Sequence, residues 1–493
     1  MRQGVRGPVI LLLVLVLALA LAQVRSVAAA AETKGSDTGT KNEAVHAAKA
    51  EAKGDATDRA VRRTFDALSK ESATCVSCHT EDNRGLYQQW GRSRHYGANV
   101  GCYECHRAEP GDPDAFMHKK FLISVMVTPK DCGRCHEGAT REFGQSVHAR
   151  AGEIEGSMSH TMATVVQGMP EESMRAAGQH GCVQCHGSKV KVKPSGKLDA
   201  TSWPNSGVGR INPDGSKGAC SACHQRHEFS LVQARHPDTC GKCHVGPVHA
   251  QKEIYGESKH GINFYANQDR MNVHSSKWIP GEDYDVSPTC ATCHMSATVD
   301  APLSHDVSQR ISWDLRAPVS FKVGKDSAES ATLWKENRKR MQAVCSACHL
   351  ESIIGNFYQQ FDNVVILYND KFGKPGQELM ESLLREGLRT PADFDESIEW
   401  TWFEIWHHAG RRVRQGASMQ APDFVQWRGF YEISQLFYTQ LIPQAEALMV
   451  QARAAGKNSH ADAVAKVLQE ILSRPEHAWF LKSSGPKQEK AAP

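Results

Sequence analysis

The chain has 493 residues, of which 40% are hydrophobic and 23% charged, and its formal net charge is +3. A charge this close to neutral, with no basic cluster interleaved with aromatic residues, excludes nucleic acid as an expected partner. All 16 cysteines fall in Cys-x-x-Cys pairs, which leaves no cysteine over for a separate disulfide bridge or a free thiol.

The N-terminus has the pattern of a secretory signal peptide, which we assign to residues 1–31. Arg2 and Arg6 precede an apolar run from Val9 to Ala22, and small residues follow from Ala28 to Ala31. The apolar run is 14 residues long, shorter than the roughly 20 that span a bilayer; an uncleaved membrane anchor is the alternative. Residues 32–60 contain almost no bulky apolar side chains, so we expect a flexible leader. We therefore expect the mature protein in the periplasm.

Between residues 61 and 355, every Cys-x-x-Cys pair is followed at once by histidine. The eight runs are Cys75, Cys78 and His79; Cys102, Cys105 and His106; Cys132, Cys135 and His136; Cys182, Cys185 and His186; Cys220, Cys223 and His224; Cys240, Cys243 and His244; Cys290, Cys293 and His294; and Cys345, Cys348 and His349. This pattern is the attachment signature of c-type haem, in which both thiols bond to the porphyrin and the histidine binds iron. The sequence predicts eight covalent haems in a domain with little regular structure, since the porphyrins supply much of the buried apolar surface.

Zinc and iron–sulfur sites also use Cys-x-x-Cys pairs, but neither requires a histidine directly afterwards. Histidine fills 24 of the 493 positions, so each such neighbour is roughly a one-in-twenty coincidence by composition. Eight in succession exclude chance, and a disulfide framework leaves the histidines unexplained.

The second axial ligand of each iron decides between electron transfer and catalysis, because two histidines close an iron and an open face can bind substrate. Sixteen histidines remain after the motif histidines, so their number alone does not decide. Six lie in polar, helix-compatible surroundings and are expected as second ligands: His95, His118, His148, His227, His260 and His305. His407 and His408 lie on an expected C-terminal helix, and His408 is a further candidate ligand. We expect His46, His460 and His477 to be solvated, and His160, His180, His236 and His274 stay undecided.

Residues 356–480 contain no cysteine and are expected to form an all-helical domain, followed by a disordered tail at 481–493. The expected helical stretches are Gln377–Glu386, Asp395–Gln415, Pro422–Ala447 and Ala461–Leu472. Pro391 and Pro422 fall where helices should begin. Trp400, Trp402, Trp406 and Trp427 are expected as helix-packing core. The fold class is therefore mainly α, a haem-wrapping region followed by a helical domain.

The chain resembles the octahaem cytochromes c related to hydroxylamine oxidoreductase, over nearly its whole mature length. The likeness rests on the eight motifs and on runs around them, above all residues 181–187, 240–249, 257–261, 288–295 and 406–412. The resemblance implies that seven haems are bis-histidine and that the fourth, on Cys182, Cys185 and His186, is the open catalytic centre. It also implies a homotrimer. In the oxidising members, a tyrosine from a neighbouring subunit bonds covalently to the catalytic porphyrin.

Two positions depart from that pattern. Phe424 stands where the family has the cross-linking tyrosine, and Tyr431, seven residues along, is the possible substitute. The family's Asp-His pair after the sixth motif is here Val248-His249. His249 can still hydrogen-bond or protonate a bound ligand, whereas Val248 removes an acidic group that accepts protons from a hydrogen-rich substrate. Both departures favour reduction.

We therefore expect a reductase that converts nitrite or hydroxylamine to ammonia at the fourth haem, with His249 and Tyr284 as catalytic residues. Its expected partners are a small nitrogen-oxide substrate and a periplasmic or membrane-bound redox protein. One alternative is an enzyme of the same family that oxidises hydroxylamine or hydrazine. A second is an electron carrier in which all eight irons are closed by histidine.

Overall fold

The computed structural model describes residues 68–156, 180–324 and 330–484. The signal peptide, the whole leader, His46, His160 and the end of the tail lie outside the described residues. The chain divides into two units, residues 1–73 and 74–493, and the second contains all eight haem motifs. This second unit is mainly helical, which confirms the predicted fold class. No helix in the described ranges combines the length and the apolar character that crossing a membrane requires.

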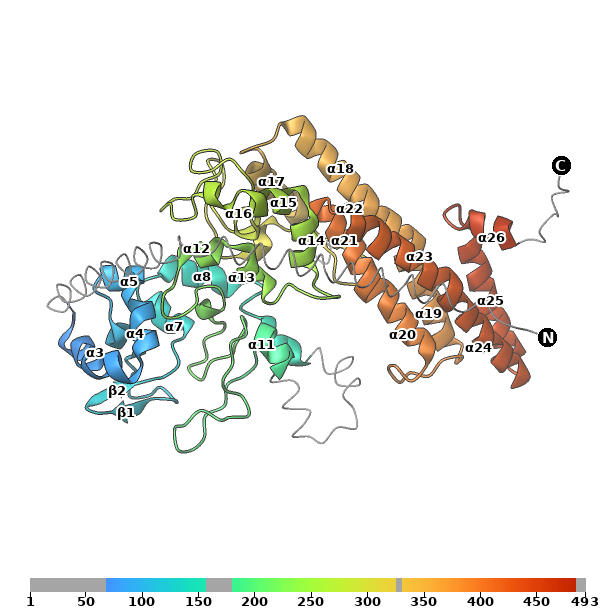
Figure 1. The fold of residues 1–493 in the computed structure, drawn as a ribbon. Coiled ribbons are helices and arrows are strands. Elements are labelled where there is room, and N and C mark those ends of the chain that lie inside the picture. Colours follow the sequence, from blue (N-terminus) through green and yellow to red (C-terminus); the bar gives the residue numbers. More distant parts are fainter. Residues whose placement is uncertain (1–67, 157–179, 325–329, 485–493) are drawn as a thin grey trace, which may run out of the picture. The chain divides into compact units, whose positions relative to one another are not determined.

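Up to residue 345 the helices are short and loops separate them (Figure 1). The α-helices are α3 (Lys70–Asp82), α4 (Arg84–Gly91), α5 (Arg94–Gly97), α6 (Cys102–His106), α7 (Pro129–Gly133), α8 (Glu137–Gln145), α11 (Cys182–His186), α12 (Leu231–Arg235), α13 (Pro237–Gly241), α14 (Gln251–Glu257), α15 (Lys259–Ala266), α16 (Cys290–His294) and α17 (Leu333–Cys345). The 3-10 turns are η2 (Ala151–Gly156), η3 (Cys220–Ala222), η4 (Gln268–Met271) and η5 (Val307–Arg310).

Two small antiparallel hairpins are the strand pairs of this region. Strand β1 (Phe116–His118) pairs with β2 (Phe121–Ile123), with Phe116 opposite Ile123. Strand β3 (Trp313–Asp314) pairs with β4 (Phe321–Lys322), with Trp313 opposite Lys322.

Several haem motifs form a single helical turn, as in α6, α11 and α16. Residues three and four apart in a helix lie on the same face, so one turn presents both cysteines and the histidine together. Capping residues next to two of the motifs stabilise the start of the helical turn. The side-chain oxygen of Thr289 accepts a hydrogen bond from the Thr292 backbone N–H at the start of α16. Thr128 and Asp131 form a capping box at α7, where the third motif begins.

From residue 351 onward the chain forms long helical rods. The first contains α18 (Glu351–Tyr368), a π-helical turn η6 (Asn369–Gly373) and α19 (Lys374–Arg385). The second contains α20 (Ser397–Phe403), the π-helical η7 (Glu404–Ala409) and α21 (Gly410–Met419). The third contains α22 (Pro422–Val425), η8 (Gln426–Tyr431), α23 (Glu432–Leu436), η9 (Phe437–Leu441) and α24 (Ile442–Ala454), and helices α25 (Asn458–Ser473) and α26 (Ala478–Ser484) come after it.

These rods differ from the expected helices at identifiable positions. Helix α18 runs through the expected domain boundary between residues 355 and 356. Pro422 begins a helix as expected, but Pro391 lies six residues before α20, which starts at Ser397. Gln420, in the left-handed region, ends the second rod.

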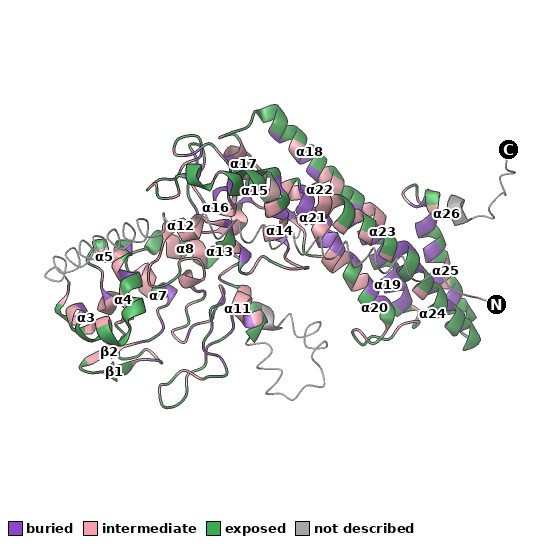
Figure 2. Cartoon of the chain, viewed as in Figure 1, coloured by how far each residue is buried: buried purple, intermediate pink, exposed green. Residues whose placement is uncertain are grey.

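The main apolar core lies among these rods, where purple buried residues concentrate in Figure 2. It includes Leu379, Ile405, Val413, Phe437 and Leu468, each almost fully buried. Two of the tryptophans expected in this core lie outside it: Trp400 is 45% and Trp427 59% exposed. The haem-motif region has a smaller apolar cluster, made of Tyr255, Phe264, Met271, Trp278, Tyr284 and Ala291.

Candidate haem-binding cavity

A continuous cavity of about 2760 Å³ runs through the haem-motif region. All eight motif histidines line it, together with most of the motif cysteines. Thiols of different motifs also meet there, because hydrogen bonds join Cys132 to Cys220, Cys240 to Cys290, and Cys243 to Cys185. The attachment residues of all eight motifs therefore border one shared space rather than eight separate pockets.

The spacing of histidine rings tests whether these residues fit haem. Two imidazoles that bind one iron from opposite faces have ring centres about 6 Å apart, because each metal–nitrogen bond is about 2 Å long. Five motif histidines face a predicted second histidine at this spacing: His79 with His118 at 6.2 Å, His106 with His227 at 6.4 Å, His136 with His95 at 6.1 Å, His244 with His148 at 6.1 Å, and His349 with His260 at 6.0 Å. The spacing of these histidine pairs thus fits a haem with two histidine ligands at five motifs. That these histidines bind iron stays a prediction.

The sixth predicted second ligand, His305, lies near the fifth motif. Burial, followed by the charges of His305, His136 and His95, lowers the pKa of His224 to about 4. His305 itself lies beside Glu142, whose carboxylate accepts a hydrogen bond from the His305 backbone N–H at 2.9 Å. Both histidines line the cavity.

The fourth motif has a partner of its own. The ring of His249 lies 6.3 Å from that of His186, the spacing of the other pairs. It also lies 6.3 Å from the ring of His244, which already faces His148. His249 stands in a turn between α13 and α14, three residues after Gly246, whose φ of 86° belongs to the left-handed region. His249 therefore lies between the fourth and sixth motifs.

The fifth and seventh motifs differ from the other six, because in the described residues no histidine ring lies at this spacing from His224 or from His294. Burial first, then the charges of His244 and Arg310, lowers the pKa of His294 to about 4. The structure thus gives His186 a facing histidine and leaves His224 and His294 without one in the described ranges.

Two predicted site residues are not brought to the fourth motif. The Tyr284 hydroxyl hydrogen-bonds to Thr292 Oγ1 at 2.7 Å inside the seventh motif, and its ring stacks on Trp278. It does not line the cavity. His408 pairs with Glu404, Nδ1 to Oε2 at 3.0 Å, and also lies outside the lining. The positions of Tyr284 and His408 in the sequence do not show which haem motif each side chain lies near.

The histidines that the sequence left undecided, or predicted to be solvated, differ in their surroundings. His236 accepts a hydrogen bond from the Asp238 N–H at the start of α13, and His180 and His274 are exposed. His460 is half-exposed and pairs with Glu386. His477, expected to be solvated, is instead buried, and its Nδ1 lies 2.8 Å from the Tyr438 hydroxyl.

Residues of the second rod reach the cavity near His249. Arg411 and Gln415 are four residues apart on α21, so they share a face, and both line the cavity. Burial, followed by the charges of Arg411 and His244, lowers the pKa of His249 to about 4. His407, in the π-helical turn η7, has a buried Nδ1 without a partner, and its pKa is lowered to about 2 by burial, Arg411, His408 and His249. The resemblance of residues 406–412 draws attention to this segment. Only the packed structure shows that Arg411 lines the cavity.

The junction that holds α21 beside His249 is apolar. Ala250 and Ile254 of the α14 segment pack against Ala421 and Phe424. Phe424 is 2% exposed, and the Arg428 guanidinium lies 4.3 Å from its ring centre. Tyr431 is 55% exposed beside Trp427 and does not line the cavity.

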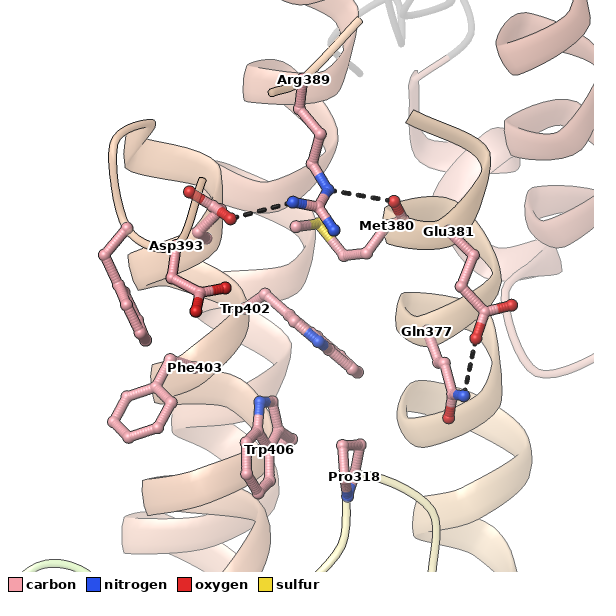
Figure 3. A pocket seen from close by; sticks show the side chains of 11 residues that line it. Pro318, Gln377, Met380, Glu381, Arg389, Asp393, Trp402, Phe403 and Trp406 are labelled. Atoms are coloured by element: carbon pink, nitrogen blue, oxygen red, sulfur yellow. Dashed lines mark hydrogen bonds and ion pairs between the residues drawn. The ribbon is translucent and has the colours of Figure 1, made fainter. Parts of the chain in front are cut away.

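A second, smaller pocket of about 310 Å³ lies among the rods (Figure 3). Trp402, Trp406 and Pro318 help to line it. Its polar groups largely pair with one another, since Arg389 bonds Glu399 at 3.0 Å and Gln377 bonds Glu381 at 2.8 Å. No haem-motif residue lines it.

Comparison with known proteins agrees with a multihaem protein. Residues 213–394 match a family described as seven times multi-haem cytochrome CxxCH, and residues 33–107 and 131–210 match cytochrome c554 and c-prime. The chain is 26% identical over 342 residues to a probable nitrite reductase-hydroxylamine oxidoreductase fusion protein of Kuenenia stuttgartiensis, covering 58% of this chain and 35% of that protein. It is 22% identical over 219 residues to the multiheme cytochrome MtrA of Shewanella baltica, covering 42% of this chain and 56% of MtrA. The chain thus spans about a third to just over half of these relatives.

Two solved structures share the fold. A hypothetical multiheme protein superposes with a TM-score of 0.69 at 26% identity, over 81% of this chain and 99% of that chain. A reducing HAO-like protein complex of Kuenenia stuttgartiensis superposes with a TM-score of 0.57 at 20% identity, over 80% of this chain and 88% of that chain.

Proposed function

We propose that this multihaem cytochrome c is an oxidoreductase that reduces nitrite, hydroxylamine or both to ammonia at its fourth haem, on Cys182, Cys185 and His186. The relative named as a nitrite reductase-hydroxylamine oxidoreductase fusion supports a nitrogenous substrate. Eight haems are bound, and the other seven deliver electrons. Export to the periplasm and electron supply by a periplasmic or membrane-bound redox protein belong to the same proposal.

The observation that carries the proposal is the surroundings of His249. Its ring faces His186, and burial, followed by the charge of Arg411 from the helical domain, lowers its pKa. Nitrite reduction to ammonium consumes six electrons and eight protons, so a proton-transferring group must stand over the reacting atoms. His249 is that group in the proposal. Tyr284 takes no part, because its hydroxyl is bound within the seventh motif.

The bound haem supplies the iron that binds the substrate nitrogen and the electrons that reduce it. The protein residues then orient the substrate and move protons. His249 is neutral at neutral pH because burial disfavours its charged form. An anionic substrate opposite the ring favours protonation, so substrate binding itself prepares His249 to donate a proton.

The spacing of His186 and His249 adds a condition. At 6.3 Å between ring centres, two imidazoles leave no room for a third ligand on one iron. The proposal therefore requires His249 to move away from His186 when substrate binds. Its place in the turn after Gly246, outside any helix, permits such a movement.

The same spacing favours a second candidate function, that of an electron-transfer cytochrome without a catalytic site. If His249 stays bound to the fourth iron, that iron only passes electrons. This function predicts neither ligand binding nor turnover at the fourth haem.

Reduction is preferred to oxidation for two reasons. Phe424 cannot form the covalent bond that a tyrosine makes in the oxidising members, and Val248 cannot accept protons from a hydrogen-rich substrate. Oxidation of hydroxylamine or hydrazine remains the alternative direction.

The deciding experiment assays the purified holoprotein in both directions. Nitrite and hydroxylamine are offered with a reduced low-potential dye, and hydroxylamine is offered with a high-potential acceptor. The proposal expects dye oxidation with ammonium as the product. Turnover in the oxidative assay alone contradicts the proposed direction, and no turnover in either assay supports the electron carrier.

We further propose a homotrimer. Trp427 and Tyr431 form an exposed aromatic pair on η8 whose burial between subunits removes apolar surface from water. Light scattering after size-exclusion chromatography should give a native mass of three chains, and Trp427→Glu should lower it. A wild-type protein of one-chain mass contradicts the assembly.

A further inference from the structure

Arg411 is a buried cation whose charge no nearby carboxylate balances. Arg411 is only 9% exposed. Nε and Nη2 both donate to the carbonyl oxygen of Arg316, at 3.1 and 2.7 Å. In the part of the chain that the structure describes, Nη1 has no acceptor and no carboxylate lies within ion-pair distance of the guanidinium.

The neighbouring charges do not compensate it. Asp314, the acidic group of this neighbourhood, is bound by Arg316, Oδ2 to Nη2 at 2.6 Å. Arg414 adds a second buried cation, which donates only to neutral acceptors such as the carbonyl oxygen of Gly410 and the Ser320 hydroxyl. A buried charge without a counterion is costly, so this cluster favours an added anion.

Arg411 is the member of the pair that reaches the cavity. It lines the cavity together with Gln415, whose Oε1 is buried without a partner, whereas Arg414 does not line it. The Nδ1 atom of His407 is likewise buried and unpartnered. Three polar atoms of the second rod, Arg411 Nη1, Gln415 Oε1 and His407 Nδ1, thus lack hydrogen-bond partners in the described part of the chain.

We propose that Arg411 binds a small oxyanion, nitrite, beside the fourth haem and thereby makes the site prefer nitrite to uncharged hydroxylamine. This inference rests on the proposed function. A guanidinium fork matches two oxygens on one central atom, which nitrite has and hydroxylamine lacks. A haem propionate presents the same oxyanion chemistry, so the experiment must separate these two sources of negative charge.

The test is an equilibrium titration of the ferric holoprotein with nitrite and, separately, with hydroxylamine, monitored by optical and electron paramagnetic resonance spectra. The variants are Arg411→Gln and Arg411→Lys. Arg412→Gln is the matched control, since Arg412 is adjacent on α21 but pairs with Glu432 and does not line the cavity.

Loss of a charge-assisted hydrogen bond costs about 1.5–3 kcal/mol, so Arg411→Gln should raise the nitrite Kd by roughly 10- to 150-fold. The hydroxylamine Kd should change by less than about twofold. Arg411→Lys, which keeps the charge without the fork, should fall between wild type and Arg411→Gln, and it decides the matter should Arg411→Gln fail to fold. Arg412→Gln should bind nitrite as wild type does.

Two kinds of outcome overturn the inference. An equal weakening of both ligands together with altered spectra of the ligand-free protein assigns Arg411 to a propionate. An unchanged nitrite Kd in Arg411→Gln, or a wild type that does not bind nitrite, removes the site. If nitrite binds in an Arg411-dependent way but is not reduced, the inference holds while the proposed function fails.

Discussion

The second histidines differ in how the chain holds them. His118 ends strand β1, His95 lies in α5 and His260 lies in α15. His148, His227 and His249 instead lie in turns, and of these three His249 is beside two motif histidines at once. A ligand carried on a regular element is held in place by its hydrogen-bonded neighbours, whereas a turn can adjust at lower cost. What singles out His249 is therefore not the turn but its ring spacing of 6.3 Å from each of two motif histidines, His186 and His244.

Replacing His249 should therefore have two effects. His249→Ala should keep eight haems but slow nitrite reduction by about 10²–10⁴-fold, the usual contribution of a proton-transferring group. It should also add one high-spin ferric signal to the resonance spectrum, because the fourth iron loses its facing imidazole. His236→Ala, at a ring that caps α13, is the control. Unchanged kinetics and an unchanged spectrum would remove His249 from the site.

How far the sequence predicts the site depends on the residue. The six second histidines chosen for polar, helix-compatible surroundings all line the cavity. Tyr284 at the fourth site stays a prediction, and the structure places its hydroxyl against Thr292 of the seventh motif. The sequence does not single out Arg411, because its significance lies in lacking a carboxylate partner, which only the packed structure reveals.

His477 makes the stability of the helical domain depend on pH. It is fully buried against Phe437 and Tyr438, and burial, helped by Lys371 and Arg474 and opposed by Glu476, lowers its pKa to about 4. In the unfolded chain its pKa is about 6.5, so the unfolded state binds the proton more readily. Stability is therefore complete above about pH 6.5 and is lost as the pH falls toward 4, by at most about 3 kcal/mol.

Thermal unfolding of the holoprotein between pH 4 and 7 measures this effect. His477→Gln, which does not titrate, should flatten the acid side of the profile for the helical domain. His460→Gln, at a half-exposed ring, should leave the profile as it is. A profile for His477→Gln that matches wild type contradicts the assignment.

Among the elements, the rods contain two prolines in their interiors. Pro375 follows the π-helical turn η6, and Pro443 follows η9. A proline ring clashes with the carbonyl four residues earlier in a regular α-helix, and here that carbonyl belongs to a π-helical turn in both cases. The wider turn lets each rod continue past its proline, consistent with the usual association of π turns with local irregularity.

The success of the sequence in predicting the helices of the rods varies with their glycine, asparagine and proline residues. The third rod is expected from its three- and four-residue spacing of apolar side chains, and it forms from Pro422 onward. The sequence does not single out helix α18, because Gly355, Asn356 and Asn363 have low helix propensity, which tertiary packing overrides. Pro391 resembles a helix start, but the chain makes a further turn before Ser397.

The junction between α14 and the third rod should control the position of His249. Phe424→Ala should lower stability by about 3–5 kcal/mol, since it leaves a cavity beside Ala250 and Ile254. Phe424→Leu should cost less. Both the melting temperature and the spectrum of the fourth haem should change in Phe424→Ala. Val450→Ala, at an exposed side chain on the same rod, should change neither; equal losses in the two alanine variants would contradict this role.

For the whole molecule, the two regions obtain their cores from different sources. The rods bury their own apolar side chains, from Leu379 to Leu468. The haem-motif region surrounds a cavity of about 2760 Å³ instead. Cofactors that fill this space supply the apolar contacts that the polypeptide lacks. The rods can therefore fold from their sequence, and the haem-motif region depends on what is attached to it.

Limited proteolysis of protein made without haem attachment tests this division. The haem-motif region should be digested within the time in which the holoprotein stays intact, leaving a resistant fragment that begins near residue 350 and retains helical circular dichroism. Resistance of the whole haem-free chain would mean that the motif region has a sufficient core of its own.

The contact between thiols of different motifs has a consequence for biogenesis. Cys132 meets Cys220, Cys240 meets Cys290, and Cys243 meets Cys185, so each pair joins two motifs. In an oxidising compartment, a chain that folded before maturation would present these sulfurs to one another, and the resulting crosslinks would block porphyrin ligation at two stations simultaneously. Attachment of haem before the chain folds would remove these sulfurs from reach of one another and so prevent the crosslinks.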